Sequence, residues 1–208
     1  MISITPIVFV VDDDASVRTS LRRMLQSEGY EIHAFSSTSN LFAQGRPDSP
    51  CCLILDVQLP EVDGLSYQET LGKMDVRVPI IFITGWGDIP MSVRAMKAGA
   101  VEFLTKPFRD QDLLDAIHVS LTQDYSRRQK QARLAEFRRR LQTLTARERE
   151  LFPLVVSGRV NKEIALEIGT SEVTVKVHRG NLMRKMQAAS FADLLRIAAD
   201  LDIPYTKV

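Results

Sequence analysis

The chain has 208 residues, of which 45% are hydrophobic and 25% charged, as is typical of a folded globular protein with one or two domains. No apolar run approaches the roughly 18 residues that a membrane-spanning helix requires, and the first residues do not have the pattern of a signal peptide. We therefore expect a cytoplasmic protein that makes no contact with a membrane.

The net charge of +1 hides an asymmetry along the chain. Residues 1–121 carry 10 basic against 16 acidic side chains, residues 122–143 carry 7 against 2, and residues 144–208 carry 10 against 8. The three net charges are therefore −6, +5 and +2. An acidic N-terminal part and a basic C-terminal part suggest that a metal or phosphate site precedes a segment that binds a polyanion.

Up to residue 121, short apolar runs alternate with helical patterns, which is typical of βα units. Five strands and five helices predict an α/β domain with a doubly wound, parallel, flavodoxin-like sheet. The adjacent Cys51 and Cys52 lie in one of the apolar runs without metal-ligand spacing, so we interpret them as buried strand thiols. The expected strands lie at residues 7–11, 31–35, 51–56, 79–83 and 101–104. The expected helices lie at residues 15–28, 37–44, 64–74, 89–98 and 109–121.

The segment 122–143 is polar and basic and contains no glycine or proline, so nothing in it ends the preceding helix. We expect a long basic helical linker here, joining the two domains. Leu134, Phe137, Leu141 and Leu144 are spaced as in a short coiled-coil seam, and a solvated charged helix is the alternative interpretation.

Residues 144–208 contain helical patterns and no strand pattern, which predicts a small all-α domain of four helices with a helix-turn-helix. Pro153 falls within the first pattern. Because proline removes a helical hydrogen bond, we expect a kink or an early break there. The expected helices lie at residues 146–157, 161–168, 172–186 and 190–201.

Acidic residues follow two of the predicted strands. Asp12, Asp13 and Asp14 come directly after the first strand, and Asp56 ends the third. In a doubly wound sheet, ligands bind beyond the carboxyl ends of the strands, so these side chains are expected to converge. Clustered carboxylates repel one another unless a cation neutralises them, and Mg²⁺ is the expected cofactor because it prefers oxygen ligands. Asp14 taken alone is better explained as a helix N-cap.

Two further strand ends add partners for phosphoryl chemistry: Thr84 follows the fourth strand and Lys106 follows the fifth. A carboxylate nucleophile needs its charge offset by a metal and a lysine, and a hydroxyl can hydrogen-bond the bound phosphoryl group. Taken singly, Thr84 is also explained as a turn residue and Lys106 as a surface residue. Pro107 follows Lys106, and we expect a cis peptide bond between them because this bond costs little before proline.

The chain resembles a response regulator of the FixJ type, within the wider NarL/LuxR group. The segments that carry the resemblance are VVDDD at 10–14, LDVQLPEVDG at 55–64, ITGWGD at 83–88, AMKAGAVEFLTKPF at 95–108 and LTARERE at 144–150. The resemblance covers nearly the whole chain, apart from the basic segment 122–143. It implies a receiver domain at residues 1–121.

This resemblance implies that Asp56 accepts a phosphoryl group from a sensor histidine kinase. It implies that Mg²⁺, with Mn²⁺ as a substitute, is held by Asp12, Asp13, Asp56 and the backbone carbonyl of Gln58. The receiver would be no enzyme beyond catalysing its own phosphorylation and dephosphorylation.

The resemblance also implies that Thr84 and Phe103 form a switch pair, in which the hydroxyl moves toward the phosphoryl group while the ring turns inward. An added dianion would bias this two-state surface. Two residues depart from the family pattern: Trp86 stands where a histidine or a small residue is more frequent, and Gln58 stands where an arginine is frequent. Both departures concern the lifetime of the phosphorylated state.

The predicted helix 172–186 has two distinct faces. The face expected to pack in the core carries Val175, His178, Leu182 and Met186. The face expected to enter a DNA groove carries Val173, Lys176, Val177, Gly180 and Arg184. Because a glycine within a helix costs about 1 kcal/mol relative to alanine, we interpret Gly180 as a close approach to another backbone or to DNA.

The segment 161–186 resembles a LuxR-type helix-turn-helix, which implies a DNA-binding domain at residues 144–208. The residues expected to contact DNA are Asn161, Lys162, Thr174, Lys176, Val177, Arg179, Gly180 and Arg184. The net charge of this domain is only +2, so a helical protein-interaction module is the alternative.

The expected function is regulation of transcription, in which phosphorylation controls dimerisation and sequence-specific binding to double-stranded DNA. A homodimer is expected from the helix at 89–98 and from the apolar spacing of Leu194, Leu195, Ala198 and Leu201. Its two-fold symmetry predicts paired half-sites about one helical turn apart, and RNA polymerase is an expected partner. Two other functions stay open: an aspartyl-phosphate hydrolase, which needs a second general acid, and a receiver-linked adaptor, which would not bind duplex DNA at low salt.

Overall fold

The computed structural model describes residues 5–39, 41–42 and 45–204, and the chain divides into two compact units, Met1–Arg128 and Gln129–Val208. Each unit has a hydrophobic core of its own. No helix in the described part of the chain is long and apolar enough to cross a membrane.

The first unit is an α/β domain built on a single parallel sheet. Its five strands are hydrogen-bonded in the order β2-β1-β3-β4-β5, and every pairing is parallel. The predicted flavodoxin-like doubly wound sheet is therefore confirmed. Its strands are β1 (Ile7–Val11), β2 (Glu31–Phe35), β3 (Cys51–Asp56), β4 (Ile80–Thr84) and β5 (Glu102–Thr105). Its helices are α1 (Ala15–Ser27), α2 (Gly64–Lys73), α3 (Ile89–Lys97) and the beginning of α4 (Asp110–Gln142).

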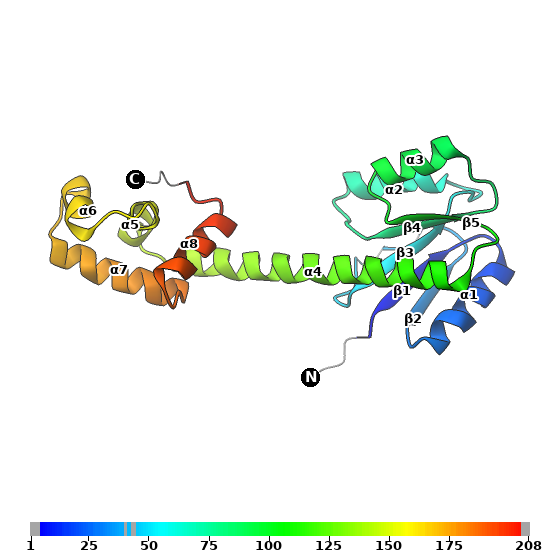
Figure 1. Cartoon of the computed structure of the whole chain (residues 1–208), viewed down its shortest axis with the longest axis horizontal. Coiled ribbons are helices and arrows are strands. Elements are labelled where there is room, and N and C mark those ends of the chain that lie inside the picture. The colour runs from blue at the N-terminus through cyan, green and yellow to red at the C-terminus, as the bar shows by residue number, and fades with distance from the viewer. Residues whose placement is uncertain (1–4, 40, 43–44, 205–208) are drawn as a thin grey trace. The chain divides into compact units, whose positions relative to one another are not determined.

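The sheet has helices on both faces, and the burial pattern follows from this layering (Figure 1). α1 and the beginning of α4 supply Leu25 and Leu113 to the core on one face, where they pack with Val10. α2 and α3 cover the other face, with Leu65 in its core. Every residue of β1, β3 and β4 is buried, which is why these strands read as continuous apolar runs rather than as alternating patterns. Cys51 and Cys52 are free and buried in β3, as predicted.

The ends of β4 and β5 differ from the predicted ones by one residue. β4 begins at Ile80 and not at 79, and β5 ends at Thr105. The Pro79 carbonyl still accepts a hydrogen bond from Leu53 N at 2.9 Å, but proline has no N–H to donate to a ladder. Thr84 and Thr105 pair at the other end although both are polar, because backbone pairing and not side-chain polarity sets the end of a strand.

The predicted helix at 37–44 is wrong for the residues that the structure describes. Residues 36–39 and 41–42 form bends and turns, and residues 40, 43 and 44 lie outside the described part of the chain. The serine side chains bond to one another and to a residue distant in the chain: Ser37 Oγ donates to Ser39 Oγ at 3.2 Å, and Ser39 Oγ donates to Glu61 at 2.8 Å. Leu41 nevertheless reaches the core.

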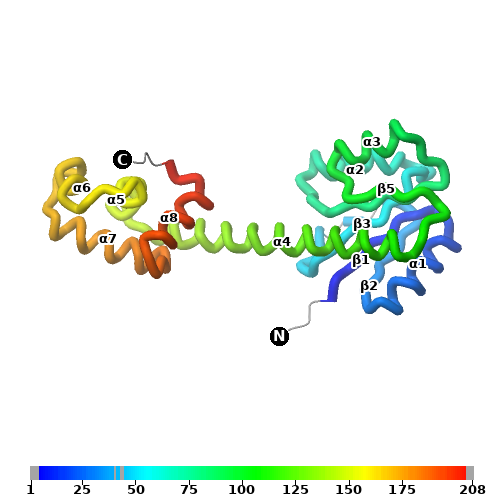
Figure 2. Tube along the Cα trace, in the orientation of Figure 1, coloured from blue at the N-terminus to red at the C-terminus, as the bar shows by residue number. Residues whose placement is uncertain are grey.

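The second unit is all-α, as predicted, and its helices pack around a shared core. α6 leads directly into α7 (Figure 2). The turn between them begins at a left-handed glycine, Gly169 (φ 64°), and Ser171 then caps α7 by accepting a hydrogen bond from Thr174 N. This short turn between two packed helices is a helix-turn-helix. Besides the end of α4, the helices are α5 (Ala146–Val156), α6 (Asn161–Ile168), α7 (Glu172–Met186) and α8 (Phe191–Asp200).

Pro153 does not break its helix early, since α5 continues to Val156. The helix starts in a capping box between Thr145 and Glu148, and Leu151 and Phe152 are buried in the core. This packing stabilises the turn around Pro153, where one helical hydrogen bond is lost.

Three of the four residues of the apolar spacing at the end of α4 pack inside this unit, which corrects the coiled-coil interpretation. Residues 129–133 of the same helix are exposed, as the solvated-helix interpretation expected. Leu144 is buried, and Phe137 and Leu141 pack against the same core. Two polar contacts accompany this packing: Arg133 pairs with Asp200 at 3.0 Å, and Arg140 donates to the Met186 carbonyl at 3.2 Å.

Candidate functional site

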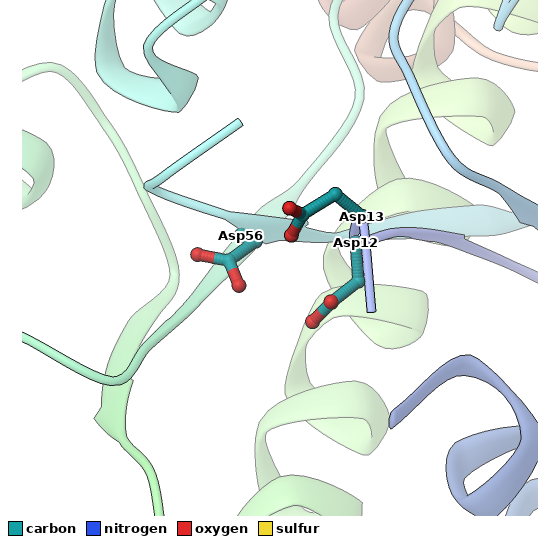
Figure 3. A group of neighbouring side chains, drawn as sticks. All are labelled: Asp12, Asp13 and Asp56. Carbon is teal, nitrogen blue, oxygen red and sulfur yellow. The ribbon is translucent and has the colours of Figure 1, made fainter. Parts of the chain in front are cut away.

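Three carboxylates converge beyond the carboxyl ends of β1 and β3. Val11 pairs with Leu55 in the parallel register, so Asp12, Asp13 and Asp56 follow at the same edge of the sheet. One carboxylate oxygen from each lies within 4.8 Å of the others, and Figure 3 shows the three side chains beside one another. The sequence predicted this group because parallel neighbours end at the same edge of a sheet.

Lys106 joins this group from the loop after β5. Its Nζ donates to Asp12 Oδ2 and to Asp56 Oδ2, each at 2.6 Å. Its backbone N–H donates to the Thr84 carbonyl at 2.7 Å, which extends the sheet by one bond, and the Lys106–Pro107 peptide bond is cis. The Lys106 ammonium is thereby held in direct contact with the carboxylates of Asp12 and Asp56.

The electrostatics of this group favour a bound cation. Asp12 is fully buried, and burial raises the pKa of its carboxyl even though the hydrogen bond from Lys106 acts in the opposite direction. Burial alone would lower the pKa of Lys106, but its hydrogen bonds to Asp12 and Asp56 raise it. Three carboxylates and one ammonium leave two negative charges, and the donors are all hard oxygens, so the set fits a divalent cation such as Mg²⁺.

These residues line an open cavity of about 570 Å³. Gln58 also lines it, and the Gln58 N–H donates to Asp56 Oδ1 at 2.9 Å. Asp14 is the N-cap of α1, accepting from Ser16 N at 2.7 Å. Hydrogen bonding to the Ser16 side chain, and then to the Ser16 N–H, lowers the pKa of Asp14. The capping interpretation of Asp14 is therefore confirmed.

Gly64 is a site residue that the sequence analysis missed. A Cβ atom at this position would lie 2.5 Å from the Asp56 carbonyl oxygen, so only glycine allows α2 to begin this close to β3. The sequence feature that could have revealed Gly64 is its place directly after Asp63, the N-cap of α2. Arg18 was also missed: it donates to the Asp12 carbonyl at 2.7 Å.

Thr84 and Phe103 lie on the neighbouring strands β4 and β5. The Thr84 side chain is fully buried, and its hydroxyl lies 3.2 Å from both the N and the O of Trp86. The Phe103 ring is partly buried, with its centroid 6.2 Å from that of Phe82. A Cβ atom at Gly87 would lie 2.9 Å from the Phe103 ring, so the loop after Thr84 passes directly against this ring.

The second candidate surface is the exposed face of α7. Val175, Leu182 and Met186 are buried in the core, whereas the side chains of the opposite face, Val173, Lys176, Val177, Gly180 and Arg184, are exposed. Thr174 is half-buried and bonds the Ser171 hydroxyl. Arg179 donates to the Asn161 side chain at 3.2 Å, which links α7 to the start of α6, where the exposed Lys162 follows.

Gly180 makes no close approach to another part of the described chain. A Cβ atom there would have no heavy atom within 4 Å. The expectation of a close contact with another backbone in the same chain is therefore wrong, and an approach to a bound partner is the interpretation that is left.

Comparisons with known proteins assign a family to each of the two units. Residues 8–118 match the family of the response regulator receiver domain, and residues 142–198 match the bacterial regulatory proteins of the luxR family. Nodulation protein W of Bradyrhizobium diazoefficiens is 49% identical over 95% of this chain and 87% of its own length. Transcriptional regulatory protein FixJ of Rhizobium meliloti is 39% identical over 92% of this chain and 94% of its own length.

A solved structure also matches nearly the whole chain. The low-resolution structure of the response regulator StyR has a TM-score of 0.85 and 46% identity, and the match covers 94% of this chain and 98% of StyR. The receiver fold, the carboxylate group beyond its sheet and the helix-turn-helix thus occur together in one chain. The protein belongs to the FixJ-type two-component response regulators, which join a receiver domain to a LuxR-type DNA-binding domain and regulate transcription.

Proposed function

We propose that Asp56 is the phosphoryl acceptor of this regulator. The observation that carries the proposal is the convergence of Asp12, Asp13 and Asp56 within 4.8 Å, with Lys106 Nζ 2.6 Å from the Asp56 carboxylate. An Asp56 oxygen attacks the phosphorus of a phosphohistidine on a sensor histidine kinase, and the bond from phosphorus to the histidine nitrogen breaks. The chain itself would catalyse this transfer and the later hydrolysis.

Asp12, Asp13, Asp56 and the backbone carbonyl of Gln58 would hold Mg²⁺. The ion would neutralise charge on the transferring phosphoryl oxygens, and Mn²⁺, with the same preference for oxygen, would substitute. Lys106 supplies the second positive charge. Because its ammonium already contacts Asp56, it would move only slightly to reach a phosphoryl oxygen on that side chain.

Thr84 and Phe103 would act as the switch pair. A phosphoryl group on Asp56 is a strong acceptor, so the Thr84 hydroxyl would exchange its bond with the Trp86 carbonyl for one with a phosphoryl oxygen. The loop against the Phe103 ring would then shift, and α3 would shift with it. The order of events is a local change of charge followed by a two-state change at the surface.

We expect phosphorylation to produce a homodimer through the receiver. The surface that supports this is an exposed apolar patch along α3 and the loop before it, made by Trp86, Ile89, Val93 and Met96. The apolar spacing on α8, which the sequence analysis also cited for a homodimer, does not support one. Leu194 and Ala198 are fully buried in the core of their own unit, and Leu195 and Leu201 are partly buried against it.

The C-terminal unit would bind double-stranded DNA by placing α7 in the major groove. Lys176 and Val177 would face bases, while Asn161, Lys162 and Arg179 would lie near the phosphate backbone. A dimer would then bind paired half-sites, and RNA polymerase would be the partner at the promoter. We expect the protein to act in the cytoplasm, where chromosomal DNA lies.

Intact-mass spectrometry after incubation with acetyl phosphate and Mg²⁺ tests the acceptor. The natural chain should gain the mass of one phosphoryl group, while Asp56→Asn or addition of EDTA should abolish the gain. Asp75→Asn is the matched control, because Asp75 is an exposed aspartate that pairs with Arg77. A gain that survives in Asp56→Asn would overturn the assignment.

A further inference from the structure

Four charged side chains meet at the amino ends of the strands, where β3 begins. Asp124, on α4, is fully buried, and its carboxylate accepts hydrogen bonds from the guanidinium groups of Arg46, Arg127 and Arg128. Arg128 Nε lies 2.8 Å from Asp124 Oδ2. All four residues belong to the unit Met1–Arg128. The carboxylate site lies at the opposite, carboxyl ends of the strands, so this group belongs to no function described above.

The group ties α4 to the backbone of three other segments. Cys51 N, at the start of β3, donates to Asp124 Oδ2 at 3.0 Å. Arg46 donates to the carbonyl of Arg77, which lies shortly before β4, at 2.6 Å, and Arg128 donates to the Asp48 carbonyl at 3.0 Å. Two of these bonds join residues more than 70 positions apart in the chain: Cys51 and Asp124 are separated by 73 positions, and Asp48 and Arg128 by 80.

Asp124 is the residue on which the whole group depends. Burial would raise the pKa of its carboxyl, but the hydrogen bonds from Arg128, from the Cys51 N–H and from Arg46 lower it, so it carries its negative charge at neutral pH. The pKa of Arg127 is lowered by burial and by the neighbouring charge of Arg46. Three cations thus share one anion, and without that anion they would repel one another in a half-buried place.

We propose that Asp124 is a positioning residue that fastens α4 to the sheet as far as Arg128, so that residues 122–128 belong to the receiver and the segment between the domains begins at Gln129. The basic character of this stretch had placed it in the linker. Arg127 and Arg128 neutralise Asp124, and Arg128 also donates to the Asp48 carbonyl shortly before β3, so they are not a solvated basic surface.

The consequence for regulation rests on the proposed function. If phosphorylation of Asp56 changes the receiver, residues 122–128 that Asp124 fastens to the sheet move with the receiver as one body and pass the change to Gln129. A helix that is loose from residue 122 onward would absorb it. Asp124 would therefore be needed for the effect of phosphorylation on DNA binding and dispensable for phosphorylation itself.

Hydrogen exchange of the full chain, followed by mass spectrometry, tests the fastening. In the natural protein the amides of residues 122–128 should be protected as strongly as those of 113–121. In Asp124→Asn they should exchange at least about tenfold faster, while the β3 amides after Cys51, whose own N–H donates to Asp124, stay protected. Asp112→Asn is the matched control, since Asp112 pairs with Arg109 on the surface of the same helix and should change nothing at 122–128.

Two further variants keep the test decisive if Asp124→Asn does not fold. Arg128→Gln removes one partner and keeps the carboxylate paired, so it should speed exchange at 122–128 by a smaller factor. Asp124→Asn combined with Arg127→Gln removes one of the excess cations and should regain part of the lost protection. Unchanged exchange at 122–128 in a folded Asp124→Asn or Arg128→Gln variant would overturn the proposal.

A second measurement separates this proposal from the proposed function. Asp124→Asn should accept a phosphoryl group to the natural extent by intact mass, yet lose most of the gain in DNA affinity that phosphorylation produces in the natural chain. A full gain in the variant would overturn the regulatory role of Asp124. No gain in the natural chain would instead contradict the proposed function, and the exchange measurement would still decide whether Asp124 fastens α4.

Discussion

Glu148 on α5 and Lys185 on α7 form an ion pair at 2.6 Å inside the C-terminal unit. The Glu148 side chain is 3% exposed, and it also accepts a hydrogen bond from Thr145 N at 2.8 Å. One carboxylate therefore closes the capping box of α5 and holds the helix that carries the proposed DNA-contacting residues. The position of α7 depends on a polar contact as well as on the apolar core.

Glu148→Gln should destabilise this unit by about 2 kcal/mol, because a charged hydrogen bond is lost and Lys185 keeps its charge without a partner. Chemical denaturation followed by circular dichroism would measure the loss. Glu150→Gln is the control: Glu150 pairs with Arg147 at the surface and should change the unfolding free energy by much less. Equal effects of the two variants would contradict the special role of Glu148.

The same residue predicts a dependence of stability on acid. Although burial opposes it, the hydrogen bonds from Lys185 and Thr145 lower the pKa of Glu148 below its unfolded value of about 4.3. A depressed folded pKa contributes stability that is fully present above the unfolded pKa and is lost as pH falls through the folded pKa. The stability difference between the natural chain and Glu148→Gln should therefore be constant above about pH 5 and shrink below about pH 4. A difference that stays constant through this range would refute the prediction.

Gly64→Ala should impair the acceptor site because its Cβ would press on the Asp56 carbonyl at 2.5 Å. We expect a loss of stability of about 1–3 kcal/mol and slower phosphorylation by acetyl phosphate. Gly72→Ala is the matched control in the same helix, since a Cβ there meets nothing within 4 Å. This control should be neutral or up to about 1 kcal/mol more stable, because alanine favours a helix over glycine. Thermal unfolding and the phosphorylation rate together distinguish the two variants.

Gly180→Ala tests whether DNA closely approaches the glycine on the exposed face of α7 or whether this glycine has no part in DNA binding. With nothing within 4 Å of the new Cβ, the variant should fold and gain up to about 1 kcal/mol of stability. If DNA approaches this position closely, the same variant should bind duplex DNA several-fold more weakly in a titration at fixed salt. Undiminished binding would mean that α7 does not approach DNA at Gly180.

Trp86, the chain's single tryptophan, gives a direct readout of metal binding. Its side chain is 78% exposed, and its backbone bonds the Thr84 hydroxyl at 3.2 Å. Adding Mg²⁺ and acetyl phosphate should change its fluorescence, and excess EDTA should reverse the effect of the metal. Asp13→Asn should raise the Mg²⁺ concentration needed for the change, since it removes one of the proposed ligands. A signal insensitive to Asp13 would place the metal elsewhere.

Much of the receiver could be predicted from the sequence because its strands are buried on both faces. β1 and β3 read as unbroken apolar runs, and an acidic residue after each run marks where the chain leaves the sheet. Parallel topology then brings those acids together without any further information. The helix-turn-helix was predictable for a similar reason, since Gly169 and Ser171 mark a helix end and a helix start.

The local pattern failed where a side chain's partner is distant in the chain. The apolar spacing of α8 and of the end of α4 was visible in the sequence, but Leu194 and Phe137 pack into one core that the spacing alone could not identify. The serine-rich stretch after β2 also had a helical spacing, yet its hydroxyls bond to one another and to Glu61.

The sequence by itself determined which residues are apolar, acidic or basic at each strand end and helix face, and this was sufficient for the fold and for the carboxylate group. Only the tertiary structure decided the role of Asp124, which in the sequence is one acid in a basic stretch. Its partner Arg46 lies 78 residues away. The physical reason is that periodicity reports how a side chain faces its own helix or strand, whereas the neutralisation of a buried charge depends on groups that folding brings from elsewhere in the chain.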